Sequence, residues 1–131
     1  MQLVAEHQPA LLSDKDGLAT ARDQLREYLC GVRTQFSLPL DLNHLTDFQR
    51  LVLKAVASVP YGVTRSYGEI AAQIGHTRAA RAVGGANAHN PLPMVIPCHR
   101  VIAANGSLGG YSGTGGPRTK RRLLSLEGVQ L

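Results

Sequence analysis

The sequence has no tryptophan, only two cysteines, and no apolar run long enough to cross a membrane. Two cysteines cannot form a disulfide framework, and the first residues lack the basic region and apolar stretch of a secretory signal. The cysteines and the five histidines show no spacing typical of zinc ligands. With 131 residues, we expect a metal-free cytoplasmic protein with one modest core.

Acidic residues are scarce in the second two thirds of the chain. Residues 45–131 hold ten Lys or Arg against three Asp or Glu, whereas residues 1–44 hold four against six. Such a balance is expected of a surface that meets phosphates. An incidentally basic protein explains the charge equally well, so charge alone does not decide the function.

A nucleotide-binding phosphate loop is also absent. Residues 106–116 are rich in glycine, but no Gly-Lys-Ser/Thr follows at the spacing that such a loop requires. We expect a tightly turning loop here, which could line a pocket.

The first third of the chain predicts one amphipathic helix at residues 14–30. Asp14 or Asp16 could cap it. Its inward face would consist of Leu18, Ala21, Leu25 and Leu29. Cys30, at its end, is expected to be a small buried hydrophobe. Residues 36–42 alternate like an extended edge strand, since they contain a proline.

The remainder predicts short helices. Thr46 can cap a helix that ends near Ser58. Its inward residues would be Phe48, Leu51, Val52, Ala55 and Val56. Ser66 and Glu69 form a capping box for the next helix, which ends at Gly75. We expect further helices from Thr77 to about Ala88 and from about Thr119 to Glu127. The helices before and after residues 75–77 fit a helix-turn-helix.

The predicted helix from Thr77 carries unusually small side chains around a single arginine, Arg81. The small residues are Ala79, Ala80, Ala82, Gly84, Gly85 and Ala86. A lean face with one arginine suits the minor groove of DNA, where shape matters more than sequence. The alternative is a tightly packed internal helix with Arg81 in a surface ion pair.

Residues 97–101 read Pro-Cys-His-Arg-Val and place Cys98 beside His99. A thiol is a strong nucleophile as a thiolate, which a nearby base favours. Because adjacent side chains cannot easily face each other, we expect a water to relay the proton and a carboxylate to orient His99. Glu127 is the only acidic residue after Glu69. An inert buried cysteine, or a cysteine hydrolase with a distant base, is the alternative.

From residue 46 onward the chain resembles the O6-alkylguanine-DNA alkyltransferases. The matching segments are residues 60–62, 66–68, 79–86, 90–91, 96–101, 110–113 and 123–128. The resemblance implies a mainly α fold: a helix-turn-helix (winged-helix-like) DNA-binding catalytic domain at residues 46–131, after a reduced N-terminal segment at residues 1–45. Many family members carry a larger α/β domain there. It also implies a cofactor-free monomer that acts once on double-stranded DNA.

In this resemblance, an alkyl group moves irreversibly from O6-alkylguanine, and from O4-alkylthymine, to Cys98. His99 would take the thiol proton through a water, Glu127 would orient His99, and Tyr67 would donate to the departing guanine. Asn90 would brace the turn between recognition helix and active site. The base pocket would be lined by Pro93, Val101, Tyr111 and Ser112. DNA would be contacted by Ala79, Ala80, Gly84, Gly85 and Arg81, with Arg81 replacing the flipped nucleotide.

Two other functions stay open. Alkyltransferase-like damage sensors bind and flip alkylated guanine without reacting; they typically have tryptophan in place of the cysteine, and they are short. Cys98 and the absence of tryptophan favour reaction, whereas the short N-terminal segment favours a sensor. The loop at residues 115–117 is slightly longer than in the family, which affects the expected pocket width and the placement of Glu127. A helix-turn-helix transcription regulator would need more base-reading side chains than the helix at residues 79–86 offers.

Overall fold

The protein is mainly α-helical, as the sequence predicts. The computed structural model describes residues 15–111 and 113–130, with the backbone alone for residues 15–18. Its helices are α2 (Lys15–Leu29), α3 (Asp47–Ala57), α4 (Tyr67–Gln73), α5 (Ala80–Ala88) and α6 (Gly116–Leu126), with a 3-10 turn η2 (Cys98–Arg100). In this part of the chain, no helix is long and apolar enough to span a membrane.

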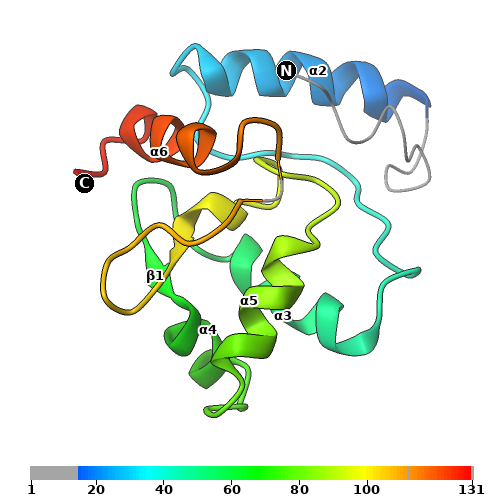
Figure 1. Ribbon diagram of the computed structural model, residues 1–131. Helices are drawn as coiled ribbons and strands as arrows, with labels where there is room; N and C mark the ends of the chain where they lie inside the picture. The colour runs from blue at the N-terminus through cyan, green and yellow to red at the C-terminus, as the bar shows by residue number, and fades with distance from the viewer. Residues whose placement is uncertain (1–14, 112, 131) are drawn as a thin grey trace.

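The strands are short and serve to hold the turn η2. Strand β1 (Arg65–Ser66) pairs in parallel with β2 (Val101–Ile102), with Arg65 opposite Val101. Because β1 leads directly into α4 and β2 follows η2 directly, the pairing brings the start of α4 beside the Cys98–Arg100 turn. Helices α2 and α6 cover this region from the side away from α4 and α5 (Figure 1).

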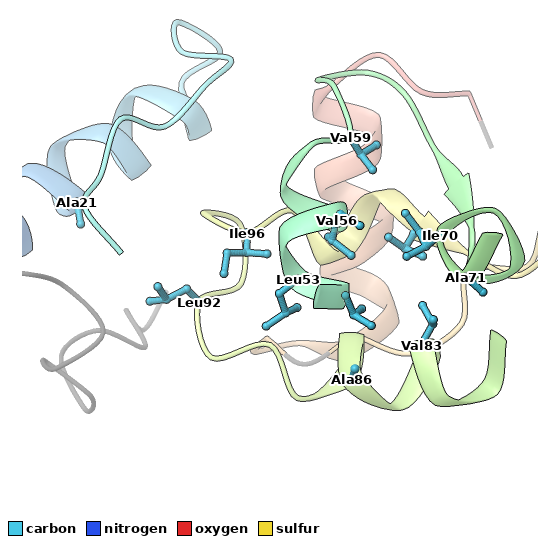
Figure 2. Close-up of a cluster of buried hydrophobic side chains, with 13 residues drawn as sticks. Ala21, Leu53, Val56, Val59, Ile70, Ala71, Val83, Ala86, Leu92 and Ile96 are labelled. Atoms are coloured by element: carbon cyan, nitrogen blue, oxygen red, sulfur yellow. The ribbon is translucent and has the colours of Figure 1, made fainter. Parts of the chain in front are cut away.

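The main core lies between α3, α4 and α5. Figure 2 shows Val56, Ile70 and Val83, one from each helix, pointing toward a common centre, and all three are fully buried. Thr46 caps α3 and Ser66 caps α4 as predicted, each in a complete capping box. These local signals are strong because each cap satisfies backbone N–H groups that the helix itself leaves unpaired.

The predicted starts of two helices were wrong. Helix α5 begins at Ala80 rather than at a Thr77 cap, because the Ala79 N–H bonds the His76 carbonyl and closes a turn there. Its capping position, Ala79, makes no side-chain hydrogen bond. Helix α6 begins at Gly116, three residues earlier than predicted, since Gly115 adopts φ 92° and Pro117 suits the first turn. Part of the glycine-rich stretch is therefore helix.

The inner face of α2 is rotated from the predicted one. Ala21 and Leu25 are buried as expected, but Leu29 is 44% exposed and Tyr28 is fully buried in its place. Adjacent helical positions differ by about 100°, so a shift of one residue moves a side chain from core to solvent. Cys30, in the turn that follows, is exposed rather than buried. Asp14 and the side chain of Leu18 lie outside the described residues, and Asp16 lies within the helix.

Two further predictions fail on packing. In α3, Leu51 is 41% exposed and Leu53 is buried instead. Residues 36–42 are in neither of the two named strands in the described part of the chain. The segment is held by a side chain: Gln24 Nε2 donates to the Ser37 carbonyl at 3.1 Å, and the Ser37 N–H donates to Gln24 Oε1 at 2.9 Å. Within the segment only Leu40 is in a β-bridge, and the buried Gln24 side chain holds the backbone at Ser37.

Candidate active site

Asn90 braces the turn that leads from α5 to Cys98. Its Nδ2 donates to the Ile96 carbonyl at 2.7 Å, and its Oδ1 accepts from the Leu92 N–H at 2.9 Å. The turn between them is tight, since Met94 adopts φ 76° and Pro93 bridges Ile96. The Asn90 side chain therefore ties together the backbone of residues 92 and 96 in this turn.

Cys98 opens the turn η2 and is buried, with 1% of its surface exposed. Its N–H donates to the Ile96 carbonyl at 2.7 Å, and its carbonyl accepts from Asn87 Nδ2 at 3.2 Å. Asn87 belongs to α5, so the helix with the lean face also fixes the backbone of the cysteine. The sequence patterns did not single out Asn87.

His99 and Glu127 form a buried pair. His99 Nε2 lies 2.7 Å from Glu127 Oε2, and neither side chain has exposed surface. Burial lowers the pKa of His99, although the hydrogen bond to Glu127 acts in the opposite direction. His99 Nδ1 makes no hydrogen bond with a described residue. A neutral imidazole that donates from Nε2 carries its basic lone pair on Nδ1, so His99 can act as a base there.

The Glu127 carboxylate is held by several donors. Arg100 Nε donates to Oε1 at 2.8 Å and Arg100 Nη2 to Oε2 at 2.9 Å, while the Gly62 N–H donates to Oε1 at 3.0 Å. Burial alone would raise the pKa of Glu127, but the hydrogen bonds from His99, Arg100 and Gly62 together lower it to about 2. The carboxylate is therefore ionised at neutral pH. Arg100 belongs to the motif at residues 97–101, but the sequence patterns did not predict a role for it.

Tyr28 was missed entirely by the sequence patterns. Its hydroxyl donates to Glu127 Oε2 at 2.5 Å and lies 3.2 Å from His99 Nε2. The leucine pattern of α2 assigned the inward face to Leu29, one residue away, so no local signal pointed to the tyrosine.

Lys120 is a second buried group that the sequence patterns did not identify. Its Nζ donates to the carbonyls of Val101 at 2.7 Å and Gly110 at 3.0 Å. Burial lowers the pKa of Lys120 to about 8, and the nearby charge of Cys98 opposes this shift. A cation near the sulfur favours the thiolate. Helical spacing from Glu127 could have placed Lys120 on the same face of α6.

Tyr67 and Tyr111 lie close enough to Cys98 for its charge to act on their hydroxyl groups. Tyr67 starts α4, and burial raises the pKa of its hydroxyl, with the Cys98 charge raising it further. The same two causes raise the pKa of Tyr111. Glycine is required beside Tyr67, because a Cβ on Gly109, at φ 70°, would lie 2.5 Å from the tyrosine oxygen. Val101 is buried in β2. Ser112 lies outside the described residues.

Helix α5 has one buried and one open face. Val83, Ala86 and Asn87 are buried, while Arg81 and Gly85 are exposed. Ala79, Ala80 and Gly84 are half-buried. Arg81 has no ion pair within the described residues, which argues against the fully internal helix. Among the residues that the structure describes, no group of His, Cys, Asp and Glu side chains could hold a metal ion.

Known proteins are similar to this chain both in sequence and in fold. Residues 47–129 match the family described as 6-O-methylguanine DNA methyltransferase, DNA binding domain. A Mycobacterium tuberculosis methylated-DNA–protein-cysteine methyltransferase is 55% identical over 114 residues, which cover 87% of this chain and 67% of the relative. The constitutive Bacillus subtilis enzyme of the same name is 48% identical over 112 residues, with 86% and 67% covered. This chain thus spans about two thirds of their length.

Solved structures of related proteins have a similar fold. M. tuberculosis OGT in complex with DNA superposes with a TM-score of 0.79 at 57% identity, covering 83% of this chain and 66% of that one. S. pombe Atl1, in complex with damaged DNA containing O6-carboxymethylguanine, has a TM-score of 0.58 at 36% identity, with 64% and 78% covered. From the matched domain and these identities, the chain belongs to the methylated-DNA–protein-cysteine methyltransferase family.

Proposed function

We propose that this protein repairs DNA by moving the alkyl group of O6-alkylguanine, and of O4-alkylthymine, onto the sulfur of its own Cys98. The observation that carries the proposal is the buried Cys98 next to His99, which is paired with Glu127 through Nε2. The other ring nitrogen of His99, Nδ1, makes no hydrogen bond with a described residue and can accept a proton. The names of the relatives support the same reaction. Residues 46–131 would form the reacting domain, and the cytoplasm would keep the thiol reduced.

In the proposed reaction the Cys98 proton passes through a water to His99 Nδ1, and Glu127 stabilises the resulting imidazolium. The thiolate attacks the alkyl carbon in line, a C–S bond forms, and the bond from carbon to guanine O6 breaks. Guanine leaves as an anion, to which the Tyr67 hydroxyl donates a hydrogen bond or proton. The product thioether is a very poor leaving group, so each molecule acts once and needs no cofactor.

The target must leave the base stack before it can react. Flipping a nucleotide out of a duplex costs a few kcal/mol. Arg81, exposed on α5, would enter the duplex and replace the lost stacking. The small residues Ala79, Ala80, Gly84 and Gly85 would let α5 approach the minor groove closely. Helices α4 and α5 would act as the helix-turn-helix, and Pro93, Val101 and Tyr111 would line the base pocket.

The alternative function is a damage sensor that binds alkylated guanine without reacting. S. pombe Atl1, which was solved with damaged DNA, is similar to this chain over 64% of its length. A buried cysteine with an adjacent base and a buried cation, Lys120, favours transfer over sensing, because a sensor has no need of these groups.

The decisive experiment is the intact mass of the protein after incubation with a duplex that contains one O6-methylguanine. We expect stoichiometric gain of one methyl group, and no gain with an undamaged duplex. Cys98→Ser should show no gain while it still binds the damaged duplex. Tight, lesion-selective binding by the native protein without any mass gain would establish the sensor function instead.

A further inference from the structure

Tyr28 joins the active-site network from outside the matched family domain, which begins at residue 47. The residue sits on α2, and none of its surface is exposed. Its ring packs against Phe36, with centroids 5.5 Å apart, and edge-on against Tyr61, with centroids 6.1 Å apart. These contacts fix the orientation of the Tyr28 ring and so hold its hydroxyl against the Glu127 carboxylate.

The hydroxyl shares one carboxylate oxygen with the histidine. Tyr28 Oη lies 2.5 Å from Glu127 Oε2, which also accepts from His99 Nε2 at 2.7 Å. Burial raises the pKa of Tyr28, and the hydrogen bond to Glu127 raises it further, so the phenol keeps its proton and donates it to Oε2. Its oxygen lone pair then faces His99 Nε2 at 3.2 Å. This arrangement suits an Nε2 that carries a hydrogen, since an Nε2 lone pair would face two oxygens.

We infer that Tyr28 is a positioning residue for the His99–Glu127 pair, which keeps the imidazole neutral and Nδ1 unprotonated before reaction. The inference rests on the proposed function, in which Nδ1 accepts the Cys98 proton. A buried carboxylate next to a histidine stabilises the imidazolium. An imidazolium has a hydrogen on Nδ1 and cannot accept another. By donating to Oε2, Tyr28 takes up part of the charge that would otherwise favour the imidazolium.

Other groups act on His99 and stay in place when Tyr28 changes. Glu127 attracts a proton to the imidazole, whereas Arg100 and Lys120 repel one. Cys98 precedes it in the chain. Tyr61 belongs to the same aromatic cluster, but its hydroxyl donates to the Leu126 carbonyl at 3.3 Å rather than to the carboxylate. Removing the Tyr28 hydroxyl therefore subtracts one donor from Glu127 while the charges around His99 remain.

The test is an NMR titration of the His99 ring nitrogens in the native protein, Tyr28→Phe and Tyr61→Phe. Phenylalanine keeps the Tyr28 ring and its packing. Because Tyr28→Phe removes one donor from the Glu127 carboxylate, that carboxylate favours the imidazolium more strongly, and we expect the His99 pKa to rise by about one pH unit. Tyr61→Phe loses the same atom from the neighbouring ring and should leave the pKa unchanged. A purely structural role for Tyr28 would not shift the titration.

An unchanged or lowered His99 pKa in folded Tyr28→Phe overturns the inference. Should that variant not fold, 3-fluorotyrosine at position 28 provides the opposite test, because its more acidic hydroxyl is a stronger donor to Oε2. The His99 pKa should then fall, and a rise or no change overturns the inference. The titration needs neither DNA nor transfer. Failure of the native protein to gain a methyl group would therefore count against the proposed function alone.

Discussion

Glu127 Oε2 lies 2.7 Å from His99 Nε2, although the two residues are 28 positions apart in the chain. Glu127 ends α6 and His99 lies in η2, so the contact joins the C-terminal helix to the turn that holds the cysteine. Arg100 completes the pair by binding both oxygens of the same carboxylate. The site is thus an ionised buried cluster, and its stability depends on pH.

The Glu127 cluster should make the protein acid-labile. The pKa of Glu127 falls from its usual 4.5 to about 2 on folding. A lowered folded-state pKa contributes stability above pH 4.5, and this contribution is lost as the pH falls through that window toward 2. Urea unfolding across this range measures the loss. Glu127→Gln should be less stable at pH 7 by about 3–5 kcal/mol, because Arg100 is left uncompensated, and should lack this part of the pH dependence.

The matched control is Glu69→Gln, since Glu69 is an exposed carboxylate in the α4 cap. This variant should keep the acid-labile behaviour of the native protein. Identical pH profiles for the native protein and Glu127→Gln would contradict the ionised cluster.

Arg81→Ala should slow repair of duplex DNA much more than reaction with free O6-benzylguanine. The free base needs no flipping, whereas unstacking a nucleotide costs a few kcal/mol, so we expect at least about a tenfold slowing on duplex alone. Single-turnover rates on both substrates measure the difference. Arg26→Ala, which removes a 74% exposed arginine on α2, is the control and should change neither rate. Equal slowing of both reactions by Arg81→Ala would contradict the proposed role of Arg81 in base flipping.

Binding to duplex DNA should weaken steadily as salt rises, because Lys and Arg contacts release counterions from phosphates. Arg78 is exposed in the turn between α4 and α5. Arg78→Ala should reduce the slope of log affinity against log salt by about one, uniformly across DNA sequences. Fluorescence anisotropy at several salt concentrations measures the slope. A flat response of the native protein would refute the basic binding surface.

Asn90→Ala should destabilise the turn before Cys98. The substitution removes the hydrogen bonds to the Ile96 carbonyl and the Leu92 N–H, and both residues are buried. Each buried polar group left without a partner should lower the free energy of unfolding by about 1–3 kcal/mol. Thermal and urea unfolding measure this loss. Asn105→Ala removes a comparable bond, to the Ser107 N–H, from an exposed turn and should cost far less. Equal costs would mean that the brace is unimportant.

Local signals in the sequence predicted local structure well. The caps at Thr46 and Ser66 were predicted because a side chain and a backbone N–H three residues away decide them. The proximity of Glu127 to His99 was anticipated because acidic residues are scarce after Glu69. The prediction that Thr77 caps α5 was wrong because a turn at residues 76–79 forms at that position.

The contacts that complete the site depend on long-range packing. Tyr28 reaches Glu127 from 99 positions away, and Lys120 reaches the Val101 carbonyl from another helix. No pattern within either helix specifies the partner. For Tyr28 an error of one residue in the inward face of α2 was enough to hide it, since Leu29 looked equally suitable for burial.

The most direct test of the account is the position of the methyl group after reaction with a duplex containing O6-methylguanine. Peptide mapping of the reacted protein should place one methyl on Cys98 and none on Cys30, the exposed cysteine that serves as an internal control. Cys98→Ser should carry none at either position. A methyl group on Cys30 or elsewhere, or an unmodified Cys98 in protein that holds the damaged duplex, would contradict the account.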